Sequence, residues 1–190
     1  MASLKRNQIH ICNGVYLLLA MGLLLLPLQW VCAVILASLW HELCHYAAFR
    51  ICGARPESWK IGSNGMEMAI SDLTPRQEFF CALAGPLGGL LTIGVMRVFP
   101  RFSLCCIAHA IYNLLPVYPL DGGRILRSAL LLHLEQHRAE RLLRVVTGSV
   151  CCLLMIGACW AAAELQAGLW PVFAALIILW RVGQADWQEG

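Results

Sequence analysis

Two histidines and a glutamate lie within five residues in the segment LWHELCHYAAFR, residues 39–50. On an α-helix, residues four apart project from one face, so His41 and His45 can reach the same metal ion. Glu42 follows His41 and is placed to take a proton from a metal-bound water molecule. Zinc lowers the pKa of its water to about 7, which makes hydroxide available near neutral pH. The spacing predicts a hydrolytic zinc site, and Cys44, which flanks the histidine face, is interpreted as a packing residue.

The surroundings of this motif strengthen the interpretation. A mostly apolar stretch from Gly14 to Trp40 precedes it and carries no charge. Ionisable side chains inside a membrane segment are costly and usually have a function. Three of them in the order found in metalloproteases are hard to explain by packing alone.

A third metal ligand is expected elsewhere in the chain, because catalytic zinc usually has three protein ligands. The segment NLLPVYPLDGGR, residues 113–124, offers Asp121 near the end of an apolar run. Its prolines break helices and its glycines permit unusual turns. Irregular backbone at membrane depth is tolerated where it is buried in protein or lines a cavity, so Asp121 is expected in a pocket. His109, on the same run, is either a partner of the site or a polar residue satisfied within the helix bundle.

The two motifs together resemble those of the site-2 protease family of intramembrane zinc metalloproteases. The resemblance is closest to the branch that contains stage IV sporulation protein FB, and it covers about residues 30–130. It implies that His41, His45 and Asp121 bind one zinc ion and that Glu42 is the general base. It also implies that Asn113 and Pro119 shape the substrate cleft.

A third segment of the chain is only partly similar to the family. LAGPLGG, residues 83–89, resembles a family segment in which Ala-Gly-Pro is followed shortly by a small residue and asparagine. Gly89 stands where the asparagine is expected. This departure weakens any role assigned to the segment but leaves the zinc site unaffected.

Composition points to an integral membrane protein. The 190 residues are 59% hydrophobic and only 13% charged, whereas soluble domains carry about 25% charged residues. The formal net charge of +3 gives no signal for nucleic-acid binding. The ten cysteines include no C-x-x-C pair and lie mostly in apolar runs, so they are interpreted as packing residues in a reduced environment, with disulfides or a cysteine metal site as alternatives.

Six apolar segments are candidate transmembrane helices, because a bilayer core needs about 20 apolar residues per helix. They are Ile9–Leu26, Gln29–Phe49, Phe79–Val98, Phe102 to about Val117, Val145–Leu165 and the short Gly168–Trp180. Residues 14–40 form one long helix in an alternative reading. With six spans and a cytoplasmic N-terminus, twelve of the 14 Lys and Arg residues lie in the cytoplasm, which favours the six-span arrangement. Both chain ends are then cytoplasmic.

Two loops carry further patterns. Apolar residues alternate on both sides of an Asn-Gly turn at residues 57–72, which predicts a β-hairpin able to bind an extended substrate or simply to cover the site. Residues 122–144 are basic and amphipathic, which is typical of either a membrane-surface helix or a solvated linker helix. Asp72 and Glu78 are interpreted as ordinary loop acids.

The sequence thus predicts an all-α polytopic membrane protein with about six transmembrane helices and a small β-hairpin between the second and third. We expect one membrane-embedded core over residues 1–190, with neither a PDZ nor a CBS domain. The predicted function is zinc-dependent cleavage of a membrane-associated protein, and regulatory membrane proteins are further expected partners. Family-level substrates are a sigma-factor precursor of sporulation or an anti-sigma factor. The alternative is a metal-binding or metal-transporting membrane protein, which leaves Glu42 and the Asp-Gly-Gly segment without a purpose.

Overall fold

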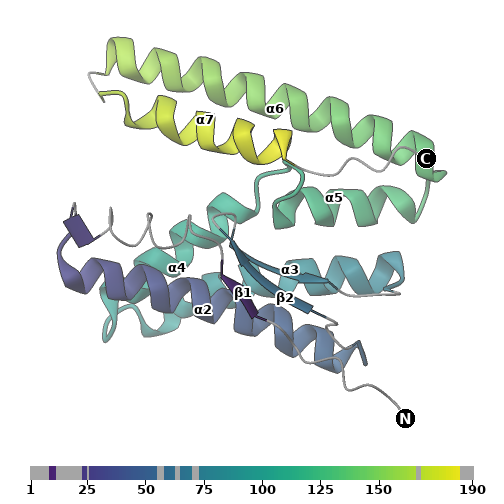
Figure 1. The fold of residues 1–190 in the computed structure, drawn as a ribbon, viewed down its shortest axis with the longest axis horizontal. Helices are drawn as coiled ribbons and strands as arrows, with labels where there is room; N and C mark the ends of the chain where they lie inside the picture. The colour runs from purple at the N-terminus through teal and green to yellow at the C-terminus, as the bar shows by residue number, and fades with distance from the viewer. Residues whose placement is uncertain are drawn as a thin grey trace.

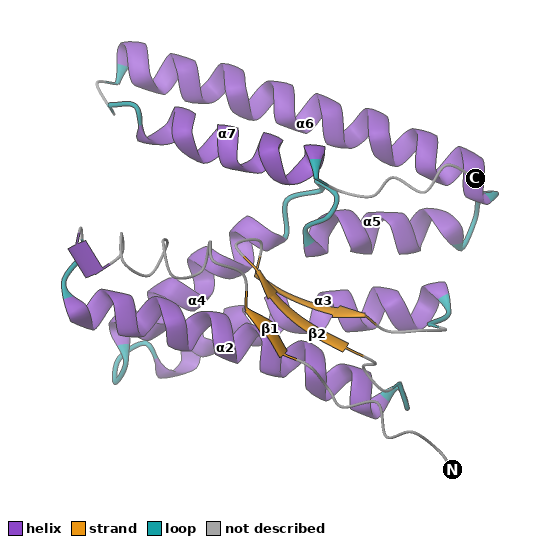
Figure 2. Cartoon of the chain, viewed as in Figure 1, coloured by secondary structure: helices purple, strands orange, loops and turns teal. Residues whose placement is uncertain are grey.

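The computed structural model describes residues 9–11, 23–24, 26–54, 58–62, 65–69, 73–165 and 168–184. Helices dominate the described part of the chain, and a small sheet lies beside them (Figures 1 and 2). Helices α6 and α7 run side by side along one edge of the molecule, and α5 lies between α6 and α3 (Figure 1). Helix α3 also packs against α2 and α4, so it stands at the centre of the arrangement.

Helix α2, Leu28–Ile51, carries the H-E-x-x-H motif. It begins directly after Pro27 and ends before Gly53, whose φ of 76° glycine adopts without steric cost. Its buried face follows a spacing of four residues, which is the spacing of one helical face. That face consists of Ala33, Ala37, His41, His45 and Phe49, with Val31 beside it. The two histidines therefore face the protein interior.

Helix α3, Pro75–Leu91, begins with a capping box between Thr74 and Gln77, with proline in its first turn. It continues as a short 3-10 helix, Thr92–Val95. Helix α4, Pro100–Asn113, also begins at a proline. Gly88 and Gly89 of α3 let the neighbouring helices approach closely: a Cβ at Gly88 would overlap the Cys44 thiol of α2, and a Cβ at Gly89 would lie 2.9 Å from a carbonyl of α4.

The C-terminal part of the described chain comprises α5, Asp121–Leu131, α6, Gln136–Glu164, and α7, Trp170–Gly183. The basic segment predicted as one surface helix over residues 122–144 is divided between α5 and the first turns of α6. A buried apolar cluster joins the turn before α5 to the two last helices. It consists of Val117, Leu120, Cys151 and Ile178.

Three short strands form the sheet. They are β1, Ile9–Ile11, β2, Ser58–Gly62, and β3, Gly65–Ala69, in the order β1-β2-β3. Strands β2 and β3 are antiparallel, with Trp59 opposite Met68, whereas β1 pairs with β2 in parallel. Ile9, predicted to start the first transmembrane helix, is therefore part of a strand.

Three helices of the described residues are long and apolar enough to cross a membrane: α2, the Pro75–Val95 segment of α3 with its 3-10 extension, and α6. The predicted all-α architecture with about six transmembrane helices and a lone hairpin is therefore wrong. Helices α4 and α7 have only 14 residues each, below the roughly 20 that a bilayer core needs. A short apolar run does not distinguish helix from strand by pattern alone, which explains the error at Ile9–Ile11. Residues 12–22 of the predicted first span lie outside the described residues.

Candidate metal centre

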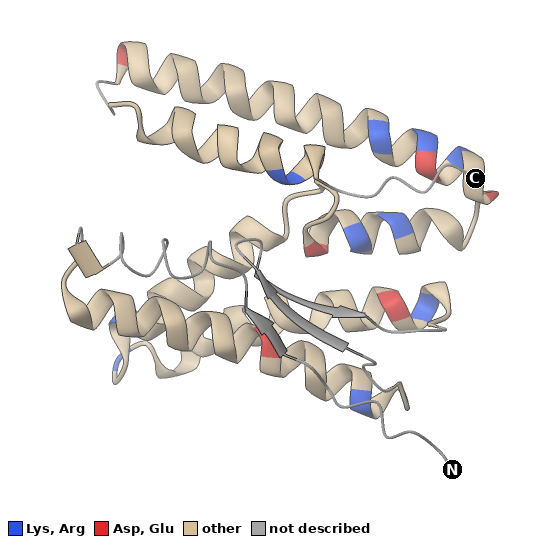
Figure 3. Cartoon of the chain, in the orientation of Figure 1, with Lys and Arg blue, Asp and Glu red and all other residues tan. Residues whose placement is uncertain are grey.

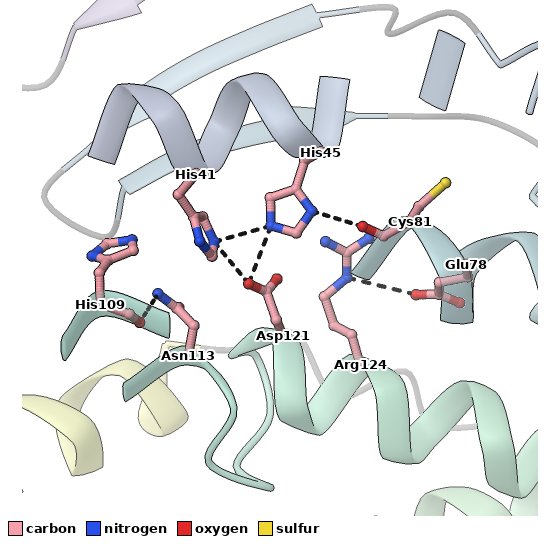
Figure 4. Close-up of polar contacts among 8 residues, drawn as sticks. All are labelled: His41, His45, Glu78, Cys81, His109, Asn113, Asp121 and Arg124. Atoms are coloured by element: carbon pink, nitrogen blue, oxygen red, sulfur yellow. Dashed lines mark hydrogen bonds and ion pairs between the residues drawn. The ribbon is translucent and has the colours of Figure 1, made fainter. Parts of the chain in front are cut away.

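His41, His45 and Asp121 converge on one point inside the protein (Figure 4). The Nε2 atoms of the two histidines are 3.0 Å apart, and they lie 2.9 Å and 3.1 Å from Asp121 Oδ2. All three residues are buried, with 3%, 4% and 7% of their surface exposed. The structure thus brings together two residues of one helix and a third that lies 80 positions away in the sequence.

The size of this triangle fits a metal ion. Two ligand atoms held 2.0–2.1 Å from a tetrahedral zinc ion are about 3.3–3.4 Å apart. The observed edges of 2.9–3.1 Å are only slightly shorter. Two imidazole nitrogens and a carboxylate oxygen are also donors that zinc accepts.

The hydrogen bonding of His45 gives a second argument for a cation. Its Nδ1 lies 2.7 Å from the carbonyl oxygen of Cys81, so Nδ1 carries the proton and donates it. In the neutral ring Nε2 then has a lone pair, and it faces the carboxylate oxygen of Asp121 at 3.1 Å. Two lone pairs at that distance repel, and a cation between them removes the repulsion.

The surroundings of Asp121 favour the ionised form of its carboxyl group. Burial by itself raises the pKa of this carboxyl group, but the interactions with His41 and His45 outweigh it and hold the pKa below its usual range. Asp121 also lies in the first turn of α5, where the helix dipole favours negative charge. The side chain therefore offers a carboxylate, the form that binds metals.

Helix α3 packs directly against the side chains of the two histidines. Besides the Cys81 carbonyl, the helix presents Gly85 to both imidazole rings: a Cβ there would overlap His45 Nε2 and lie 2.8 Å from His41 Cε1. The indole Nε1 of Trp40 donates to the Gly88 carbonyl at 2.9 Å, which fixes α2 against α3 at the level of the motif. Only glycine at position 85 leaves room for both rings.

A tight turn places Asp121. Val117 and Leu120 anchor this turn in the apolar cluster with α6 and α7, and Leu120 N–H donates to the Val117 carbonyl at 2.8 Å. A Cβ at Gly122 would overlap the carbonyl oxygens of residues 114 and 115, and one at Gly123 would overlap the backbone nitrogen of residue 118. The two glycines let α5 start directly against the preceding loop.

Ion pairs fix α5 between its neighbours. Arg127 Nε donates to Glu140 Oε1 of α6 at 2.8 Å, and Arg127 Nη1 lies 3.6 Å from Glu78 Oε2 of α3. Arg124 Nε lies 3.7 Å from Glu78 Oε1 (Figure 4). Figure 3 shows these charges on the side of the molecule where α3, α5 and the first turns of α6 meet. Glu78 is therefore a helical residue that ties α3 to α5, and the prediction of an ordinary loop acid is wrong.

The remaining predicted residues lie near the triangle. Glu42 is half-buried on α2 and interacts electrostatically with His45, Asp121 and Arg124. Asn113, at the end of α4, donates from Nδ2 to the His109 carbonyl at 3.0 Å (Figure 4). Pro119 lies in the turn before Asp121. The roles predicted for Asn113 and Pro119 in a substrate cleft stay predictions.

Sequence reasoning missed several contributors to the site. His109 is not among them, because the sequence already allowed it as a partner of the site, and its ring packs edge-on against that of His41, with centroids 4.6 Å apart. Gly85 and the Cys81 carbonyl were not identified, and neither were the ion pairs of Arg124 and Arg127. Only Gly85 had a signal in the sequence, since it lies in the Ala-Gly-Pro segment that resembles the family.

Known proteins resemble this chain in sequence and in fold. The model of peptidase family M50 matches residues 88–157, a region that includes Asp121. The chain is 26% identical over 187 residues to stage IV sporulation protein FB of Bacillus subtilis (strain 168). The match covers 90% of this chain and 64% of that protein, so the chain spans less than two thirds of the relative's length. Its fold matches that of a site-2 protease from Methanocaldococcus jannaschii with a TM-score of 0.70 and 16% identity, over 97% of this chain and 93% of the other.

Together with the three apolar helices, these similarities indicate a membrane protein. The chain is thus similar over part of its length to peptidase family M50, similar in sequence to stage IV sporulation protein FB, and similar in fold to a site-2 protease.

Proposed function

We propose that this protein is a zinc-dependent endopeptidase that cleaves a membrane-associated protein substrate. The observation that carries the proposal is the buried triangle of His41, His45 and Asp121, which has nearly the size of a tetrahedral zinc site. Similarity to a peptidase family supports the reaction class. One ion accounts for all three side chains.

The ligand set would hold zinc through His41 Nε2, His45 Nε2 and Asp121 Oδ2. When bound, the ion would polarise the scissile carbonyl and lower the pKa of a water molecule to about 7. The carboxylate of Glu42 accepts a proton from the attacking water and later delivers one to the nitrogen of the leaving amine. The Cys81 carbonyl keeps His45 in the tautomer whose Nε2 is free to bind.

The location of the site supports the proposal that the substrate is itself in or near the membrane. His41 and His45 lie on α2, which is long and apolar enough to cross a bilayer. A transmembrane helix hides its peptide bonds in backbone hydrogen bonds, so a substrate must unwind locally before water can attack. We expect a multi-pass membrane enzyme, and the basic residues Lys5, Arg6 and Arg181 near the two ends of the chain favour a cytoplasmic location for both.

The test is a comparison of wild type with Glu42→Gln. Because the three ligands are intact, the purified variant is expected to hold the same amount of zinc. Its cleavage rate is expected to fall about 10²–10⁴-fold, the usual contribution of a general base. Substrates can be found by comparing the N-terminal peptides of membrane proteins in cells that express either form.

A matched control is Glu164→Gln, which makes the same chemical change at an exposed position near the end of α6. It is expected to leave zinc content and cleavage unchanged. Removal of zinc with a chelator and its replacement should abolish and restore cleavage by the wild type. Full activity in Glu42→Gln, or cleavage that survives complete loss of zinc, would refute the proposal.

A further inference from the structure

Two cysteines from different helices meet beside the metal centre. Cys52 forms the C-terminal cap of α2, and Cys81 lies within α3. Their Sγ atoms are 3.7 Å apart, although the residues are 29 positions apart in the sequence. Cys52 is half-buried, whereas Cys81 is buried. The side-chain amide of Gln77 donates to the Cys52 carbonyl at 3.3 Å, which holds the end of α2 against α3.

Both cysteines are connected to a metal-binding side chain. The carbonyl of Cys81 accepts the hydrogen bond from His45 Nδ1 at 2.7 Å. Cys52 follows His45 by seven residues, two helical turns along the same side of α2. A change in the distance between the two sulfur atoms therefore acts on His45 from both helices.

We propose that Cys52 and Cys81 form a reversible disulfide that weakens metal binding at the neighbouring site. The inference rests on the proposed function, because it assigns a redox control to the same zinc centre. It replaces the interpretation of these two cysteines as packing residues. The pair shares one feature with redox-sensing pairs: a partly exposed cysteine lies next to a second that can resolve the first intermediate.

The reaction needs an oxidant, and a low-molecular-weight disulfide such as oxidised glutathione supplies it. The Cys52 thiolate attacks one sulfur of the oxidant, which forms a mixed disulfide and releases one thiol. The Cys81 thiolate then attacks the Cys52 sulfur and releases the second thiol. Two protein thiols are oxidised and one disulfide is reduced to two thiols, so electrons and protons balance.

The geometry explains why the bond affects the metal. A disulfide has a sulfur–sulfur distance of about 2.0 Å, so the two atoms must approach by about 1.7 Å. The side chain of Cys81 starts from the same residue whose carbonyl orients His45. Loss of a hydrogen bond that orients a metal ligand typically lowers metal affinity about 10–100-fold, and we expect an effect of that size.

The experiment uses the purified full chain in detergent, treated with oxidised glutathione and compared with the reduced form. Mass spectrometry of peptides should show a Cys52–Cys81 cross-link. Zinc affinity, measured by competition with a chelator, should fall about 10–100-fold on oxidation and recover with dithiothreitol. Cys52→Ser should bind zinc like the reduced wild type and should not respond to the oxidant. Cys159→Ser, at an exposed position of α6, should respond as the wild type does.

Three results would overturn the inference. The first is the absence of the cross-link after full oxidation of exposed thiols, and the second is a cross-link that leaves zinc affinity unchanged. The third is a loss of affinity on oxidation that persists in Cys52→Ser. Failure of the proposed function has a different signature, because the reduced wild type would then bind no zinc at all. That outcome would overturn the inference as well, whether or not the cross-link forms.

Discussion

Replacing Gly85 with alanine adds a methyl group at the point where α3 touches both histidines. The new Cβ would overlap His45 Nε2 and lie 2.7 Å from His45 Cε1 and 2.8 Å from His41 Cε1. Ordinary contacts of a Cβ atom begin at 3.4 Å. The rings must therefore move by at least 0.7 Å and 0.6 Å, or α3 must retreat by a similar distance.

Neither movement is compatible with an intact metal site. Metal–ligand distances tolerate deviations of about 0.2 Å, several times less than the required shift. Retreat of α3 would stretch the 2.9 Å bond from Trp40 to Gly88 and the 2.7 Å bond from His45 to Cys81. We expect Gly85→Ala to lower zinc affinity by at least about tenfold, by analogy with the loss of an orienting group. Cleavage should fall about 10²-fold, the typical effect of a 1 Å misplacement.

The assays are zinc content of the purified protein, zinc affinity by chelator competition, and cleavage of a co-expressed substrate. Gly157→Ala is the matched control, since it makes the same change within α6 where a Cβ would meet nothing within 4 Å. Alanine favours helix over glycine by up to about 1 kcal/mol, so the control should be at least as stable as the wild type. Wild-type zinc affinity and cleavage in Gly85→Ala would refute the packing argument.

Three further predictions concern the rest of the site and the topology. Asp121→Ala should lose zinc and cleavage together, whereas Asp121→Asn should weaken zinc binding because the negative charge is gone. If the alanine variant holds zinc as the wild type does, Asp121 is not a ligand. Glu140→Gln should lower the free energy of unfolding by about 1.5–3 kcal/mol, because Arg127 loses a charged partner 2.8 Å away. Chemical denaturation measures this, and an unchanged midpoint of the unfolding transition would contradict it. Reporter fusions at Lys5 and Gln188 should both report the cytoplasm, and an external signal from either would refute the predicted orientation.

Local patterns were the reliable part of the sequence analysis. Residues four apart share a helix face wherever a helix forms, so the common direction of His41 and His45 follows from their spacing. The long uncharged run predicted a membrane helix there, and α2, Leu28–Ile51, contains the predicted Gln29–Phe49 span. Residues Val145–Leu165 were likewise predicted as a span, and α6 extends over nearly all of them.

Tertiary contacts decided the local structure of segments whose sequence pattern was ambiguous. Ile9–Ile11 is apolar and suits either a helix or a strand, and its pairing with β2 decides for the strand. The basic segment after Asp121 was predicted as one helix, but the chain turns between α5 and α6, and Arg127 of α5 pairs with Glu140 of α6. Ion pairs between residues distant in the sequence leave no periodic signal.

The sequence by itself determined the chemical types of the site: two imidazoles and a glutamate at helical spacing, and an aspartate beside two glycines. These choices depend only on local geometry and on the donors that zinc accepts. The tertiary structure alone decided that Asp121 Oδ2 reaches both histidines and that the Cys81 carbonyl orients His45. It also decided that Gly85 makes room for the rings. Each of these depends on how closely α3 and α5 pack against α2, and packing distances between helices are a property of the assembled fold.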